Sequence, residues 1–220
     1  MRYSTVLLIG VCAASSVWAQ VAPGKEVQGR PARPSPADYQ AKAVAGTVTI
    51  AADFVGHSVP TDQNPLTTED YVVAEVAFFG PDGARLTLAA SEFSIRINAK
   101  KSATPSQPYG FVLKTLKDPE WLPPEPPEGS GPKSKGGLSS GGGGGGGAAG
   151  DPKPPEPKMP FPLKRLMEQK AQKSALPEGD RALPQGGLVF FPYRGKDTGI
   201  KQLELIYEGP AGKATLTFEF

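Results

Sequence analysis

The sequence contains few of the residues from which most catalytic and metal-binding sites are built. Among its 220 residues there is one cysteine and one histidine. A single cysteine cannot form an intramolecular disulfide, and it cannot provide the several thiolates of a structural zinc site. One histidine leaves little for His-based catalysis. We therefore predict no catalytic residue, no bound cofactor and no metal ligand.

The sequence also lacks a strong charge of one sign and a long apolar run. Its 24 lysines and arginines face 22 aspartates and glutamates, which gives a formal net charge of +2. This excess is too small for electrostatically driven binding of nucleic acid. No apolar run approaches the length of about 20 residues that a membrane-spanning helix needs. We therefore expect neither a nucleic-acid partner nor a transmembrane span.

Residues 1–19 have the features of an export signal. Arg2 supplies a positive charge, and an apolar stretch over residues 6–14 follows it. Val17 and Ala19 then provide the small residues that precede a cleavage site. The apolar stretch is too short to cross a bilayer as a helix. We expect a signal peptide and a mature protein that is periplasmic or secreted.

Composition divides the remaining chain into four regions. Residues 20–45 are rich in proline and predict an extended, mobile N-terminal arm. Residues 46–116 and 178–220 are rich in strand-forming residues. Residues 117–177 hold 13 prolines and 12 glycines in 61 positions, with seven consecutive glycines at 141–147. Such a segment cannot bury enough apolar surface to offset the entropy of ordering it, so we predict a disordered linker.

Strands are predicted where β-branched and aromatic residues gather or alternate with polar ones. The segments are 47–50, 71–79, 84–88, 93–98, 187–192, 202–208 and 214–220. A turn-forming sequence at 80–83 predicts that 71–79 and 84–88 form a β-hairpin. In 93–98 and 214–220 the alternation predicts strands with one buried face.

One part of the linker has the composition of a helix rather than of a disordered chain. Residues 163–176 contain good helix formers, and Pro162 suits a helix start. Their apolar residues stand near helical spacing: Leu163, Leu166, Met167 and Ala171. A helix of this length is marginal alone. We expect a short amphipathic helix that docks weakly on the β-rich regions.

The two β-rich regions are each too short for a stable sandwich. Together they reach the size of an ordinary domain. Because loop-closure entropy grows only logarithmically with length, a 61-residue insertion is thermodynamically tolerable. We therefore predict an all-β fold, a discontinuous β-sandwich whose two parts share one hydrophobic core. The alternative is two separate small β domains with thin cores.

The strand sequences also resemble a known group of domains. The resemblance is carried by EDYVVAEVAFF (69–79), SEFSIRIN (91–98), ALPQGGLVFFP (182–192), LELIYE (203–208) and KATLTFEF (213–220). Taken in this order, they resemble secreted bacterial immunoglobulin-like domains of unknown function. The resemblance implies an immunoglobulin-like β-sandwich outside the cytoplasm. It implies no active site.

The candidate chemical residues are better explained as ordinary surface residues. His57 has Asp53 before it and Ser58 beside it, but a catalytic triad requires convergence in space. A metal site of His57 with Asp53 or Asp62 and a loose calcium site of Asp62, Glu69 and Asp70 are weaker explanations for the same reason. Met159 and Met167 were weighed as copper ligands beside His57. We favour a loop histidine and solvated carboxylates.

We therefore predict an exported, non-enzymatic immunoglobulin-like protein that acts as an interaction or structural module. Its partner would be a protein or a cell-envelope component. The sequence leaves two alternatives open. One is an exported hydrolase or metal-dependent enzyme centred on His57, and the other is an envelope scaffold that works through its low-complexity segment.

Overall fold

The computed structural model describes residues 28–124 and 158–220, and these residues are mostly β-structure. The strands are β1 (Ala41–Ala45), β2 (Val48–Gly56), β3 (Ser58–Val59), β4 (Leu66–Thr68), β5 (Tyr71–Phe79), β6 (Arg85–Leu88), β7 (Phe93–Ile97), β8 (Thr104–Pro105), β9 (Leu116–Lys117), β10 (Gly179–Ala182), β11 (Gln185–Pro192), β12 (Gln202–Gly209) and β13 (Gly212–Glu219). The helices are α1 (Tyr109–Val112) and α2 (Phe161–Ser174), with 3-10 turns at Pro36–Asp38, Ala90–Glu92 and Asp197–Gly199. The prediction of an all-β fold is confirmed at this level.

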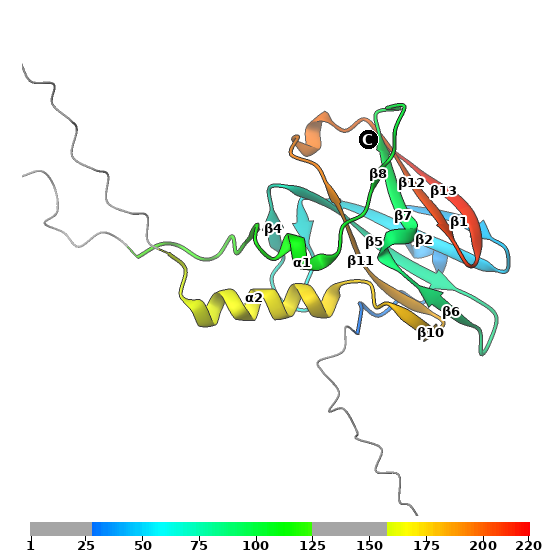
Figure 1. The fold of residues 1–220 in the computed structure, drawn as a ribbon, viewed down its shortest axis with the longest axis horizontal. Coiled ribbons are helices and arrows are strands. Elements are labelled where there is room, and N and C mark those ends of the chain that lie inside the picture. Colours follow the sequence, from blue (N-terminus) through cyan, green and yellow to red (C-terminus); the bar gives the residue numbers. More distant parts are fainter. Residues whose placement is uncertain (1–27, 125–157) are drawn as a thin grey trace, which may run out of the picture.

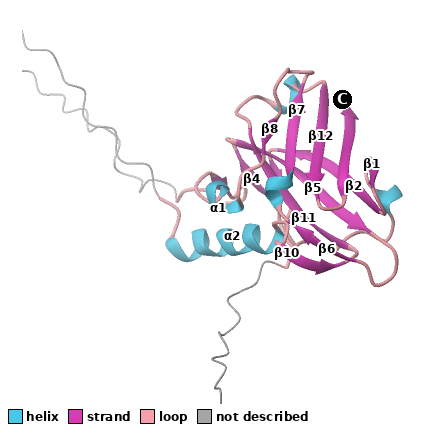
Figure 2. Cartoon of the chain, turned by 45° about the vertical axis from the view of Figure 1, so that its right-hand side comes forward, coloured by secondary structure: helices cyan, strands magenta, loops and turns pink. Residues whose placement is uncertain are grey.

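Two four-stranded antiparallel sheets pack face to face. The first sheet has the order β1-β2-β5-β11, and the second has the order β13-β12-β7-β8. Figure 2 shows β7 and β12 crossing in front of β2 and β5, with α2 outside the strands. The centre of the shared core is aromatic, since the ring of Tyr207 lies 5.6 Å from that of Phe78 and 5.2 Å from that of Phe93. This core lies between the two sheets.

The parts of the chain before and after residues 125–157 are joined in both sheets. In the first sheet β5 pairs with β11 over eight residue pairs, from Tyr71↔Pro192 to Phe78↔Gln185. In the second sheet β7 pairs with β12 from Phe93↔Tyr207 to Ile97↔Leu203. The buried core includes side chains from both parts. The two β-rich regions therefore form one body with a common interior.

Helix α2 covers part of the outer face of the first sheet. Met167 and Ala171 of the helix are buried against Val73 of β5 and Leu188 and Phe190 of β11. Figure 1 shows the helix beside α1, with its C-terminal end near β11 and the chain continuing from there to β10. The predicted helix is confirmed within two residues at each end. One of its predicted apolar-face residues, Leu166, is 46% exposed instead of packed against the sheet.

The N-terminal part of the described chain covers another area of that outer face. Tyr39 packs against Ala51 and Ala77, and Ala32 and Phe79 adjoin them. Residues 28–39 therefore lie on the sheet, which differs from the expectation of a free arm over 20–45. The first strand also begins at Ala41, before the predicted start of the β-rich region at residue 46.

The predicted hairpin between residues 71–79 and 84–88 is wrong. Strand β6 pairs with β10, whereas β5 has β2 on one side and β11 on the other. Both edges of β5 are thus occupied, and the turn closed by the bond from Ala84 N to Pro81 O at 2.9 Å leads the chain away from it. Turn-forming residues report a change of direction, but they do not identify the strand that pairs next.

Other predictions can be placed on the structure only in part. The alternation in β7 and β13 is confirmed, because Phe93, Ile95, Leu216 and Phe218 are buried. Of the predicted disordered linker over 117–177, the described residues include Lys117 of β9 and the whole of α2, which are regular structure. The predicted signal peptide and the glycine run fall outside the described residues. Among the residues that are described, no helix has the length and apolar character needed to cross a membrane.

Candidate functional site

An apolar pocket opens along the edge of β11 that faces away from β5. One edge of this strand pairs with β5, and the opposite edge meets two short chain segments instead of a full strand. Leu176 donates its backbone N–H to Leu188 O at 2.9 Å, and Gln107 donates its backbone N–H to Phe190 O at 2.8 Å. The two segments approach from different elements, one after α2 and one before α1. The pocket lies between these two segments and is lined by residues of both.

Glycine at position 187 allows the first of these segments to approach. A Cβ atom at Gly187 would overlap the backbone of Leu176, so a larger residue there would push the segment off the strand. The neighbouring Gly186 faces the other side of the sheet, where a Cβ would press on Arg30 O at 3.0 Å. Two successive glycines therefore let the chain pack closely on both faces of β11. The sequence contains this signal as Gly-Gly at the start of an apolar strand.

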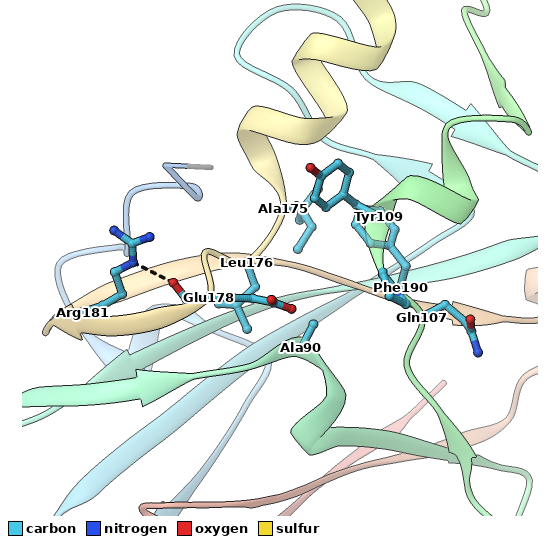
Figure 3. A pocket seen from close by; sticks show the side chains of 10 residues that line it. Ala90, Gln107, Tyr109, Ala175, Leu176, Glu178, Arg181 and Phe190 are labelled. Carbon is cyan, nitrogen blue, oxygen red and sulfur yellow. Dashed lines mark hydrogen bonds between the residues drawn. The ribbon is translucent and has the colours of Figure 1, made fainter. Parts of the chain in front are cut away.

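The pocket has a volume of about 400 Å³ and a mostly apolar lining. Its floor is formed by Leu188 and Phe190 of β11. Because the side chains of Ala90 and Ala175 are small, they leave the pocket space open. The ring of Tyr109, at the start of α1, forms another part of the wall (Figure 3). Residues from before and from after the segment 125–157 thus line the same pocket.

The charged groups at the pocket belong to the connection between α2 and β10. Glu178 directs its carboxylate toward the space beside Ala90 (Figure 3). Arg181 donates from Nε to the backbone carbonyl of Glu178 at 3.2 Å, and its guanidinium points away from that carboxylate. Within residues 28–124 and 158–220 the carboxylate of Glu178 forms no ion pair. The rim therefore holds the carboxylate of Glu178 and the guanidinium of Arg181, of which the carboxylate faces the pocket.

The ring of His57 bonds to neither Asp53 nor Ser58, its two candidate triad partners from the sequence. Its Nδ1 lies 2.5 Å from Oδ1 of Asp197, and its Nε2 lies 3.3 Å from the backbone carbonyl of Tyr193. The same Asp197 also accepts the backbone N–H of His57 at 3.3 Å. Asp53 lies elsewhere, in a pair with Arg33. The histidine thus ties the chain after β11 to the end of β2.

A second hollow of about 530 Å³ lies next to this histidine. Phe54, Ile200 and Phe220 provide its apolar lining, and Asp197 stands at its side. Among the described residues, no serine or threonine hydroxyl bonds to either ring nitrogen of His57. The pair of His57 and Asp197 was missed from the sequence because the two residues lie 140 positions apart.

The carboxylates weighed as calcium ligands each pair with a cation. Lys173 bonds to Asp62 at 2.6 Å and lowers the pKa of that carboxyl through this bond and its charge. The two other pairs are Lys117 with Glu69 at 2.6 Å and Arg194 with Asp70 at 2.8 Å. Met167 lies on the buried face of α2, and Met159 packs against the same apolar cluster, which does not include His57. In the parts of the chain that the structure describes, no three metal-ligating side chains come together.

Two buried acids on the first sheet form an ion cluster with the N-terminal segment. Asp53 of β2 and Glu75 of β5 stand opposite each other in the sheet and are 8% and 5% exposed. Arg33 pairs with Asp53 and lies 3.9 Å from Glu75, which Arg30 approaches at 3.4 Å. Two like charges directly opposite each other in a sheet repel, and the two arginines compensate for this. A glutamate inside an otherwise apolar strand was the sequence signal of this cluster.

Tyr39 completes the arginine cluster. Its ring centroid lies 4.4 Å from the guanidinium carbon of Arg33, and its hydroxyl accepts the backbone N–H of Arg33 at 3.0 Å. Partial burial would lower the pKa of Arg33, but the hydrogen bond to Asp53 and the nearby carboxylates raise it above its ordinary value. Arg33 therefore remains a cation, and the cluster fastens residues 28–39 to the sheet.

Comparison with known protein families, with curated proteins and with solved structures found no match in any of the three. The assignment of a function therefore depends on the pocket, the histidine pair and the ion cluster. Of these, the ion cluster is fully occupied by the chain's own side chains. The apolar pocket, in contrast, has room for a ligand.

One further polar contact lies just behind the pocket. Glu92 follows Ala90 in the same 3-10 turn, and its carboxyl meets the hydroxyl of Tyr207, which is fully buried. Burial raises the pKa of Tyr207 to about 12. Burial also raises the pKa of Glu92 above its ordinary value of 4.5, and the nearby Tyr207 hydroxyl and Ala89 backbone oppose this only in part. Folding thus shifts the protonation equilibrium of Glu92 toward its neutral form, compared with the unfolded chain.

We predict that Arg33→Ala destabilises the protein by about 2 kcal/mol or more, because it leaves buried carboxylates uncompensated. The measurement is urea denaturation at neutral pH. Arg85→Ala is the matched control, since Arg85 pairs with Asp180 on the surface. Its loss should lower the free energy of unfolding by at most about 1 kcal/mol. Adding Asp53→Asn to Arg33→Ala should recover part of the loss. Equal costs for Arg33→Ala and Arg85→Ala would contradict the prediction.

A second prediction concerns pH. Because folding raises the pKa of Glu92, the folded state binds this proton more tightly, and the wild-type chain loses stability as pH rises through the folded pKa. Glu92→Gln removes this loss and keeps a group that can bond to Tyr207. We expect the variant to gain melting temperature over the wild type between about pH 4 and about pH 7. An advantage that shrinks over this range would refute the assignment.

Proposed function

We propose that the chain is an exported, non-enzymatic binding module with an immunoglobulin-like β-sandwich, and that it holds an apolar group of its ligand in the pocket at the edge of β11. The observation that carries this proposal is the pocket of about 400 Å³ with Leu188 and Phe190 as its floor. Binding sites for small groups are commonly of this size, with an apolar lining and few polar groups.

The placement of the pocket supports a binding role. It lies where two backbone segments replace a full neighbouring strand on β11, so its shape is determined by hydrogen-bonded main chain. Ser106 adds a bond from its hydroxyl to Ala90 O at 2.6 Å, which fixes the wall on the opposite side. A site built on such a frame is formed before its ligand arrives, which lowers the entropic cost of binding.

The proposed location and the proposed kind of partner are inferred from the sequence. An N-terminal segment with the features of a signal peptide supports export to the periplasm or beyond. A ligand encountered there would be a protein or a component of the cell envelope, with the apolar group in the pocket belonging to it. The order of the strand sequences supports the immunoglobulin-like form of the two packed sheets.

One observation favours an enzyme as the second candidate. His57 and Asp197 lie 2.5 Å apart beside a hollow, as the histidine and carboxylate of a hydrolase do. Yet Nε2, which would activate a nucleophile, faces the carbonyl of Tyr193 instead of a hydroxyl. We therefore rank this candidate below the binding module. The third candidate, a scaffold acting through the low-complexity segment, concerns residues outside the described ones.

The binding proposal is tested with N-phenyl-1-naphthylamine, a neutral dye that fluoresces in apolar surroundings. We expect saturable binding to the wild-type chain, and binding about tenfold weaker in Ala90→Leu, whose larger side chain fills the pocket. Ala182→Leu is the matched control, because it makes the same change at an exposed position of β10. Thermal unfolding confirms that each variant folds. Dye binding that is absent, or equal in all three proteins, would refute the proposed site.

A further inference from the structure

We infer that the pocket at the edge of β11 selects ligands whose apolar body carries an ammonium group. This inference rests on the proposed function, because it specifies the ligand class of the same pocket. Its basis is the combination of one carboxylate and one aromatic ring over an apolar floor. Each of these three parts comes from a different segment of the chain.

The carboxylate is that of Glu178, at the rim. It points toward the pocket space between Leu176 and Ala90 (Figure 3). The nearest basic residue along the chain, Arg181, bonds to the carbonyl of Glu178 rather than to its carboxylate. In the described parts of the chain the carboxylate has no ion-pair partner, so its charge is available to a cationic ligand.

The aromatic ring is that of Tyr109, at the start of α1. Figure 3 shows it on the side of the pocket away from Glu178, next to Ala175. Aromatic faces attract ammonium groups through the ring quadrupole, and the attraction is stronger where water is excluded. A ligand that lies on Leu188 and Phe190 would therefore place a cationic end between an aromatic ring and a carboxylate.

The other polar groups do not favour an anion. Gln107 directs its amide away from Glu178 (Figure 3). The guanidinium of Arg181 points away from the pocket carboxylate as well. Although Arg181 is among the lining residues, the charged group that faces the pocket space is the carboxylate of Glu178, which repels an anionic ligand. A neutral ligand would gain only from the apolar floor. The expected order of affinity is therefore ammonium, then neutral, then anion.

The test uses three probes of similar size and different charge: 2-phenylethylammonium, 2-phenylethanol and 3-phenylpropionate. Binding to the full-length mature chain is followed at neutral pH by NMR titration of backbone amides around the pocket. In the wild-type protein we expect the ammonium to bind about fivefold more tightly than the alcohol, with the carboxylate weakest. In Glu178→Gln the difference between ammonium and alcohol should fall to within about twofold.

Two controls separate the possible outcomes. Glu219→Gln makes the same change at an exposed position of β13 and should keep the preference for the ammonium. Equal binding of alcohol and ammonium to the wild type, or a preference that persists in Glu178→Gln, would overturn the inference and leave the pocket proposal standing. If none of the three probes perturbs the pocket amides, the proposed function itself fails, and this inference fails with it.

Discussion

The antiparallel pairing of β5 with β11 is the interaction on which the rest of the structure depends. It joins two segments that lie on either side of residues 125–157, and it places β5 in the interior of the first sheet. From Val72 to Phe78 every residue of β5 is buried, so both faces of the strand need cover. The second sheet covers one face. The other is covered by α2 and the N-terminal segment, and the outer edge of β11 forms the pocket.

The outer face of β5 shows how these coverings are arranged. Val73 lies under α2, Glu75 meets the arginines of the N-terminal segment, and Ala77 lies under Tyr39. These residues are two positions apart and so point to the same side of the strand. A buried acid in the middle of this row would be costly alone. Its pairing with Arg30 and Arg33 explains why a proline-rich segment, which would otherwise extend into solvent, lies on the sheet.

The sequence predicted what depends on local pattern. Alternation identified the buried face of β7, and helical spacing identified α2. It did not predict long-range partners, because β6 pairs with β10 and His57 with Asp197 across distances that local signals do not encode. The pocket was missed for the same reason, since Ala90 and Ala175 carry no local signal and the fold alone brings them together with Tyr109. Glu75 was missed as well, although an acid within an apolar strand is a local signal of a buried partner.

Native-state hydrogen exchange tests the shared interior most directly. The amides of β5 and β7 come from the first part of the chain, and those of β11 and β12 from the second. If the two parts form one cooperative body, the slowest amides of all four strands will exchange through the same global unfolding, with equal opening free energies and equal dependence on denaturant. If the strands after residue 158 open at a free energy distinct from that of the strands before residue 124, the account is contradicted.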